Sequence, residues 1–107
     1  MYRAAALALC LAAKALPAAS GDGEACQLGL RVQAAAAAIR NPELGGAMRA
    51  VTGLGSDSRY YTMVRGWLVQ QLKGDRSIVA ASGSDRVPRI EERIRFLEEA
   101  IRALDLE

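Results

Sequence analysis

Residues 85–107, DRVPRIEERIRFLEEAIRALDLE, decide the fold class. Their apolar residues recur at steps of three and four, which places the side chains on one face of an α-helix. The members of this heptad seam are Val87, Ile90, Ile94, Leu97, Ile101 and Leu104. Asp85 is suited to cap the helix, and Pro88 suits its first turn, where a missing N–H costs little. The stretch therefore predicts a long amphipathic C-terminal helix.

This apolar seam needs a surface to pack against. Each of its six side chains stabilises the protein by roughly 1.5–3 kcal/mol only when it is fully buried. The seam is shorter than the three to four heptads that a free-standing coiled coil normally needs. We therefore expect it to pack against earlier helices of the same chain, with a coiled coil between two copies as the alternative.

The preceding residues also have helical spacing. Leu28, Val32, Ala35 and Ile39 share one face, and Asn41-Pro42 ends that helix. A short second stripe follows, made of Leu44, Met48 and Val51.

A break at 52–58 then leads into a helix over 59–73. Ser56 or Asp57 is placed to cap this helix, and Gly74 is placed to end it. Its main stripe comprises Tyr61, Val64, Leu68 and Leu72. Residues 75–85 favour a short helix or a loop. The sequence thus predicts an all-α fold, a small bundle of three to four helices in one domain over residues 21–107.

The opening residues 1–20, MYRAAALALCLAAKALPAAS, resemble a cleavable secretory signal peptide. Arg3 supplies the positive end, residues 4–13 form an apolar run, and small residues follow Pro17. The apolar run is too short to cross a bilayer because Lys14 interrupts it. We expect a periplasmic or secreted protein without a stable membrane span. The alternatives are an organellar transit peptide and a cytosolic adaptor that keeps an N-terminal helix.

The charge balance argues against nucleic acid as a partner. The chain has 14 basic and 12 acidic residues, and removing residues 1–20 takes away Arg3 and Lys14 and leaves twelve of each. A neutral chain lacks the basic field that holds a phosphate backbone.

Cys26 is the only cysteine that remains after this cleavage, because Cys10 lies within the apolar run. In an exported protein, a single cysteine indicates an intermolecular disulfide or a free thiol. The alternative is a small buried apolar side chain.

Catalytic and metal-binding patterns are missing from the sequence. The chain has no histidine, so it lacks the most common general base and metal ligand. Residues 53–56 could bind an anion ahead of a helix, but Asp57 stands where that anion would sit. The paired glutamates at 91–92 and 98–99 lie among arginines and indicate a solvated surface. We expect no enzyme, no cofactor and no metal.

The aromatic and arginine-rich segment 59–67 is the most distinctive local cluster. Tyr61 and Arg65 are spaced for a cation–π contact, and Gly66 leaves room for a neighbour. Aromatic residues and arginine are enriched in binding hot spots. The expected function is non-catalytic binding of a partner protein or of a second copy through apolar helix faces. The candidate contact residues are Tyr60, Arg65, Trp67, Ile90, Ile94, Leu97 and Ile101.

The alternative function is a carrier of a small apolar or aromatic ligand. A helical bundle can enclose an apolar pocket. The expected lining comprises Tyr61, Met63, Trp67, Leu68 and Phe96.

Overall fold

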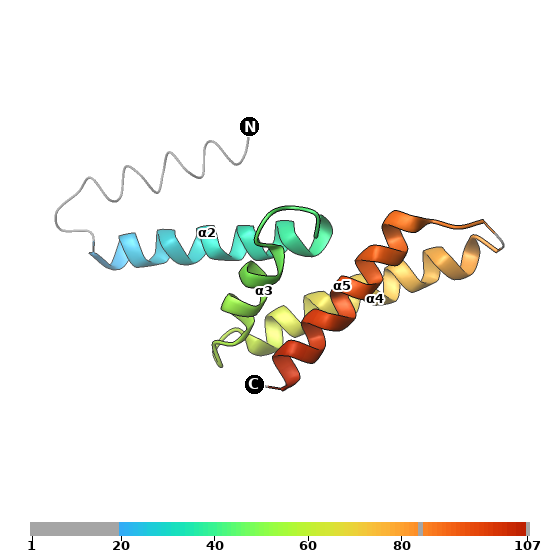
Figure 1. Cartoon of the computed structure of the whole chain (residues 1–107). Helices are drawn as coiled ribbons and strands as arrows, with labels where there is room; N and C mark the ends of the chain where they lie inside the picture. The colour runs from blue at the N-terminus through green and yellow to red at the C-terminus, as the bar shows by residue number, and fades with distance from the viewer. Residues whose placement is uncertain (1–19, 84, 107) are drawn as a thin grey trace. The chain divides into compact units, whose positions relative to one another are not determined.

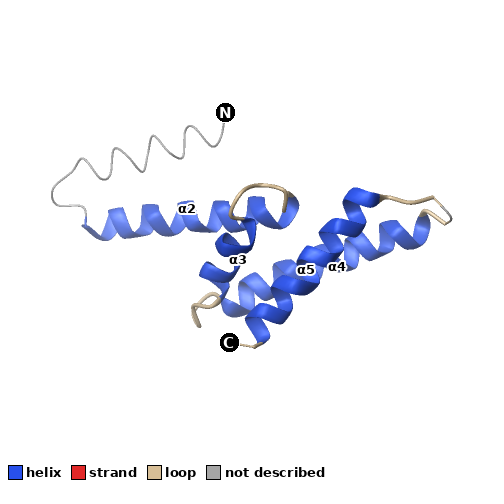
Figure 2. Cartoon of the chain, in the orientation of Figure 1, coloured by secondary structure: helices blue, strands red, loops and turns tan. Residues whose placement is uncertain are grey.

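A computed structural model of the chain describes residues 20–83 and 85–106. These residues form four α-helices, and they contain no strand (Figures 1 and 2). The helices are α2 (Ser20–Arg40), α3 (Ala47–Gly55), α4 (Tyr61–Ala81) and α5 (Pro88–Asp105). The expected all-α class is confirmed. Residues 1–19 of the expected leader lie outside the described residues, so its cleavage stays a prediction.

The chain divides into two compact units, residues 1–33 and 34–107. The described part of the first unit is the N-terminal portion of α2. The second unit contains the end of α2 together with α3, α4 and α5. As expected, α2 ends immediately before Asn41-Pro42, because the residue before a proline disfavours helical backbone.

Within the second unit, α4 and α5 pack along each other, and α3 packs against both. Apolar side chains from all three helices are buried together, which confirms that the C-terminal helix packs within its own chain. The largest fully buried apolar side chains are Val51, Leu54, Val64, Leu68 and Leu97.

Gly55, the last residue of α3, fixes how closely α3 approaches the other two helices. A Cβ atom at this position would lie 2.7 Å from Leu104 Cδ2 and 3.1 Å from Val64 Cγ1. These distances are shorter than van der Waals contact, so a larger residue at position 55 requires the side chains of Leu104 and Val64 to shift.

The helix α4 is longer than the sequence analysis predicted. Gly74 lies inside the helix rather than at its end, and α4 continues to Ala81. The turn follows at Gly83, whose φ of 63° is a left-handed conformation that glycine adopts without a Cβ penalty. Residues 75–81 are therefore helical, and the loop begins only after them.

Asp57 Oδ1 accepts the backbone N–H of Arg59 over 3.0 Å in the turn that leads into α4, whereas the predicted cap of the C-terminal helix does not form. The residue before α4 is Tyr60, which makes no side-chain capping bond. Instead, the Asp57 carbonyl accepts the N–H groups of Tyr60 and Tyr61. The residue before α5 is Val87, again without a side-chain cap, so Asp85 does not cap this helix. Pro88 does stand in the first turn as expected.

The buried line of α5 is rotated from the predicted seam. Leu97, Ala100 and Leu104 are buried, whereas Ile90, Ile94 and Ile101 are half-buried. The spacing of the buried residues points back one turn to Arg93, whose guanidinium is almost entirely buried. Arg93 therefore lies on the buried face of α5, where a search for apolar residues alone does not identify it.

Candidate functional site

The centre of the second unit holds an ion pair that the sequence analysis did not identify. Asp75 of α4 has no exposed surface, and the Arg93 side chain is only 13% exposed. Arg93 Nε donates to Asp75 Oδ2 over 2.8 Å, and Arg93 Nη2 donates to Asp75 Oδ1 over 2.7 Å. Gln71 Nε2 donates a third hydrogen bond to Asp75 Oδ1 over 3.0 Å.

Arg93 also binds the end of α2. Its Nη1 donates over 2.9 Å to the carbonyl oxygen of Arg40, the last residue of that helix. A helix C-terminus carries orphan carbonyl groups and a partial negative charge, both of which a guanidinium satisfies. One side chain thus joins α5 to α4 and to the C-terminal turn of α2.

The pKa of Asp75 reflects competition between burial and these bonds. Burial by itself raises the pKa of this carboxyl group, since it disfavours the charged form. The hydrogen bonds from Arg93 and Gln71, together with the charge of Arg93, outweigh burial and leave the pKa below its usual value. Asp75 is therefore an ionised and fully paired group rather than a poised acid or base.

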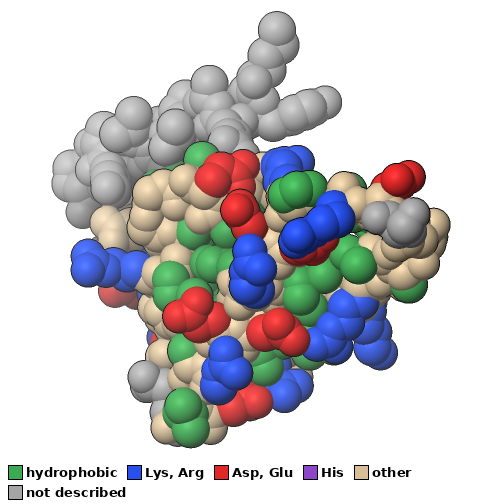
Figure 3. Space-filling view, turned by 45° about the vertical axis from the view of Figure 1, so that its right-hand side comes forward, with side chains coloured by type: hydrophobic (Ala, Val, Ile, Leu, Met, Phe, Trp, Pro, Cys, Tyr) green, Lys and Arg blue, Asp and Glu red, His purple; other side chains and the backbone are tan. Residues whose placement is uncertain are grey.

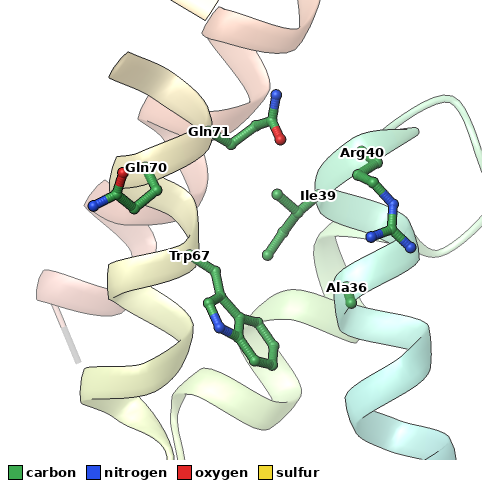
Figure 4. Close-up of a pocket in the computed structure, with 6 residues that line it drawn as sticks. All are labelled: Ala36, Ile39, Arg40, Trp67, Gln70 and Gln71. Carbon is green, nitrogen blue, oxygen red and sulfur yellow. The ribbon is translucent and has the colours of Figure 1, made fainter. Parts of the chain in front are cut away.

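A cleft opens beside this ion pair, between the C-terminal turn of α2 and the middle of α4. Its volume is about 360 Å³. Trp67 and Gln71 from α4 and Ile39 from α2 point into the space between the two helices (Figure 4). The full lining comprises Ala36, Ile39, Arg40, Trp67, Gln70 and Gln71.

A second polar cluster lies where α4 begins and α5 ends. Asp105 Oδ1 accepts from the Tyr61 hydroxyl over 2.7 Å and from Arg65 Nε over 2.9 Å. Arg65 Nη2 donates to Asp105 Oδ2 over 3.0 Å. The hydrogen bond from Arg65, followed by that from Tyr61, lowers the pKa of Asp105 to about 2. The hydrogen bond that Tyr61 donates to Asp105 is also the main cause of the raised pKa of Tyr61.

The aromatic cluster is arranged differently from the expectation. The cation–π contact places the Arg59 guanidinium 5.2 Å from the centre of the Tyr60 ring. Arg65, expected to contact the Tyr61 ring, is instead bound by Asp105. Gly66 is exposed, and a Cβ atom there would have no neighbour within 4 Å, so no described helix uses this glycine for a close approach.

The expected ligand-lining residues separate into different environments. Trp67 lines the cleft beside α2, whereas Tyr61 lines a second cleft with Gly55 and Leu104. Phe96 lines a third cleft, and Leu68 is fully buried in the core. A single pocket that joins Tyr61 to Trp67 is therefore not the arrangement found.

The expected contact residues also divide by exposure. Leu97 is fully buried and belongs to the core, because it lies on the line that faces α4. Ile90, Ile94 and Ile101 form a half-buried stripe along one flank of α5. Glu98 and Asp105 lie on the same flank by helical spacing and bind Arg76 and Arg65 of α4. The isoleucine stripe thus runs beside the edge of α5 that borders α4.

Cys26 is disulfide-bonded, and the described residues include no free cysteine. The other cysteine of the chain, Cys10, lies outside the described residues. A disulfide between two copies therefore stays a prediction.

No helix among residues 20–83 and 85–106 is long and apolar enough to cross a membrane. The same residues contain no group of three or more cysteine, aspartate or glutamate side chains placed to hold a metal ion.

The chain was compared with family models, with curated proteins and with solved structures, and none of them matches it.

Proposed function

We propose that this protein is an exported, non-catalytic helical module that binds a partner protein or a second copy of itself. The observation that carries the proposal is the half-buried stripe of Ile90, Ile94 and Ile101 on α5. Branched apolar side chains gain free energy when a partner removes their remaining surface from water, at roughly 25 cal/mol per Å².

The surroundings of the stripe favour a specific contact over general adhesion. The ion pairs Arg76–Glu98 and Arg65–Asp105 border the stripe. Basic, acidic and hydrophobic side chains are mixed on the face of the molecule shown in Figure 3. Apolar anchors within a mixed polar rim are the usual composition of an interface between soluble proteins. Tyr60, carrying Arg59 above its ring, and Arg65 offer further contacts of hot-spot type.

Export is supported by the leader-like composition of residues 1–20. The mass of the protein recovered from cell fractions tests this part. Loss of residues 1–20 from the exported fraction is expected, and a full-length cytosolic protein would overturn it.

Site-specific photocrosslinking tests the interaction surface. A benzophenone side chain would be placed at Ile94 or Ile101 in the native cell, with exposed Arg95 on the same helix as the matched control. We expect adducts from positions 94 and 101 and little from position 95. An adduct of twice the chain mass means self-association, and a different discrete mass means a partner protein. Equal yields at all three positions, or no adduct, would refute the proposed surface.

The second candidate function, carriage of a small ligand, is favoured by one observation, the cleft at Trp67. The cleft is formed by α2 and α4, whereas the isoleucine stripe lies on α5. The two functions therefore use different residues and can be tested separately.

A further inference from the structure

The cleft beside Trp67 has an apolar interior. The Trp67 indole, Ile39 and Ala36 form this interior (Figure 4). Arg40 and Gln70 also line the cleft, but their guanidinium and amide groups are directed away from the space between α2 and α4 (Figure 4). The volume of about 360 Å³ lies at the lower end of the range for small-molecule sites. A small and largely apolar molecule would therefore fill it.

Gln71 is the polar side chain of the lining that points into this space (Figure 4). Its Nε2 atom donates to Asp75 Oδ1 over 3.0 Å, one turn further along α4. Its Oε1 atom accepts no hydrogen bond from the described residues and lies on the side of the amide that faces Ile39 (Figure 4). The upper end of an otherwise apolar cleft thus carries a hydrogen-bond acceptor without a donor.

The Asp75 carboxylate determines which end of the Gln71 amide faces the cleft. Arg93 binds both oxygens of Asp75 and keeps this group ionised, although it has no exposed surface. An ionised carboxylate only accepts hydrogen bonds, so Gln71 must present Nε2 to it. Turning the amide around would place two acceptor oxygens against each other in a buried site. Oε1 is therefore held toward the cleft, and the amide cannot turn to donate to a ligand.

The same ion pair holds both walls of the cleft in place. Arg93 binds Asp75 on α4 and also donates to the backbone carbonyl of Arg40 at the end of α2. These bonds join the two helices that carry Trp67 and Ile39. A preformed site loses less conformational entropy on binding than a site that must first be ordered. The buried ion pair is therefore a positioning element for the cleft and for its acceptor.

We infer that this cleft binds a small neutral aromatic molecule that carries one hydrogen-bond donor, such as a hydroxyl group. The ring lies against Trp67 and Ile39, and the donor binds Gln71 Oε1. A carboxylate is disfavoured because it would set its acceptor oxygens against this acceptor. An ammonium group is disfavoured because no carboxylate is among the lining residues to balance its charge. The inference rests on the second candidate function, carriage of a small ligand, and is independent of the isoleucine stripe.

The single tryptophan of the chain provides a direct probe. The indole N–H resonance of Trp67 would be followed by NMR in ¹⁵N-labelled protein. The probes are 2-naphthol, 2-methoxynaphthalene, in which a methyl group replaces the donor proton, and 2-naphthoate, which offers only acceptors at neutral pH. We expect a saturable shift with 2-naphthol and a Kd at least about fivefold weaker with each of the other two compounds.

Two variants with matched controls locate the site. Gln71→Leu should abolish the preference for 2-naphthol over 2-methoxynaphthalene, because the acceptor is gone. Gln70→Leu should keep that preference, because the Gln70 amide is directed away from the cleft (Figure 4). Ala36→Leu should fill the cleft and abolish the shift, whereas Ala34→Leu, at an exposed position of the same helix, should retain it. Thermal unfolding followed by circular dichroism establishes that each variant is folded.

The comparison of the three compounds on the unaltered protein does not depend on whether any variant folds. Equal affinity for 2-naphthol and 2-methoxynaphthalene, or tighter binding of 2-naphthoate, would overturn the inference and leave ligand carriage standing. An unchanged preference in Gln71→Leu would overturn the assigned acceptor. The absence of a saturable shift with all three compounds would overturn ligand carriage as well. None of these results affects crosslinking from Ile94, so the interaction module is tested separately.

Discussion

The helix pair α4–α5 is held by two aspartate–arginine pairs that have the same chemistry and different surroundings. In both pairs, Nε and Nη2 of one arginine bind the two carboxylate oxygens of one aspartate. Asp75 and Arg93 are 0% and 13% exposed, whereas the Arg65 and Asp105 side chains are each 39% exposed. The two pairs thus form a comparison in which burial is the main variable.

Burial changes what the loss of one partner costs. An exposed charge that loses its partner is solvated by water, so the net contribution of an exposed pair is small. A buried charge that loses its partner stays in a medium of low dielectric constant, and the penalty is large. The buried pair therefore specifies how the helices meet, because alternative packings leave Asp75 or Arg93 without a partner.

The largest effect is expected from removing the buried arginine. Arg93→Met leaves the Asp75 carboxylate buried without its counter-ion and leaves the Arg40 carbonyl without its donor. The free energy of unfolding should fall by about 3–5 kcal/mol, as measured by urea denaturation at neutral pH. A loss below about 1 kcal/mol would mean that water reaches Asp75 freely and that the two pairs do not differ.

A double replacement tests whether the penalty comes from the uncompensated charge. In Asp75→Leu with Arg93→Met, no buried charge remains, so most of the lost stability should return. Urea denaturation of the two single variants and the double variant gives the coupling energy. Additive losses would show that the site is sensitive to side-chain shape rather than to charge.

The same two regions show how far the sequence allowed the fold to be predicted. Periodicity identified the helices and the burial of Val64, Leu68 and Leu72, since these residues follow a regular helical spacing. Asp75 continues that spacing three residues after Leu72, yet charged residues are normally assigned to the surface. Only the tertiary structure supplies Arg93 as its partner, so no local pattern revealed the pair.

The candidate site was predictable in part for a similar reason. Trp67 was named as a candidate contact residue because aromatic residues are prominent in interfaces, and its role stays a prediction. Arg40 was not identified as a neighbour of Trp67, since it comes from a separate helix and only the tertiary structure places both at one cleft. The single expected pocket is not formed, because Tyr61 and Trp67 on α4 line different clefts and Phe96 on α5 lines a third.

Adding a methyl group at Gly55, close to the exposed Arg65–Asp105 pair, should have an intermediate effect on stability. Gly55→Ala would place a Cβ atom against Leu104 and Val64, next to the Asp105 cluster. Overpacking of this kind should lower the free energy of unfolding by about 1–3 kcal/mol in thermal or urea denaturation.

Gly53→Ala is the matched control on the same helix. Gly53 is exposed, and a Cβ atom there has no neighbour within 4 Å. This variant should gain roughly 0.5–1 kcal/mol, because alanine favours a helix interior over glycine. If the two variants behave alike, then helix propensity rather than close approach governs position 55.

The smallest effect is expected at the exposed pair, and its acid titration shows why. The pKa of Asp105 is about 2 in the folded chain, whereas an unperturbed aspartate has a pKa of about 3.9. Because the folded pKa is the lower one, the stability that the pair adds is present above about pH 4 and disappears as the pH falls toward 2. NMR titration of the Asp105 carboxyl group measures this pKa directly, and Arg65→Gln should move it toward the unperturbed value.

Added salt should raise the pKa of Asp105 through screening and should barely affect the pKa of the buried Asp75. If salt moved both carboxyl groups equally, then burial would not distinguish the two ion pairs.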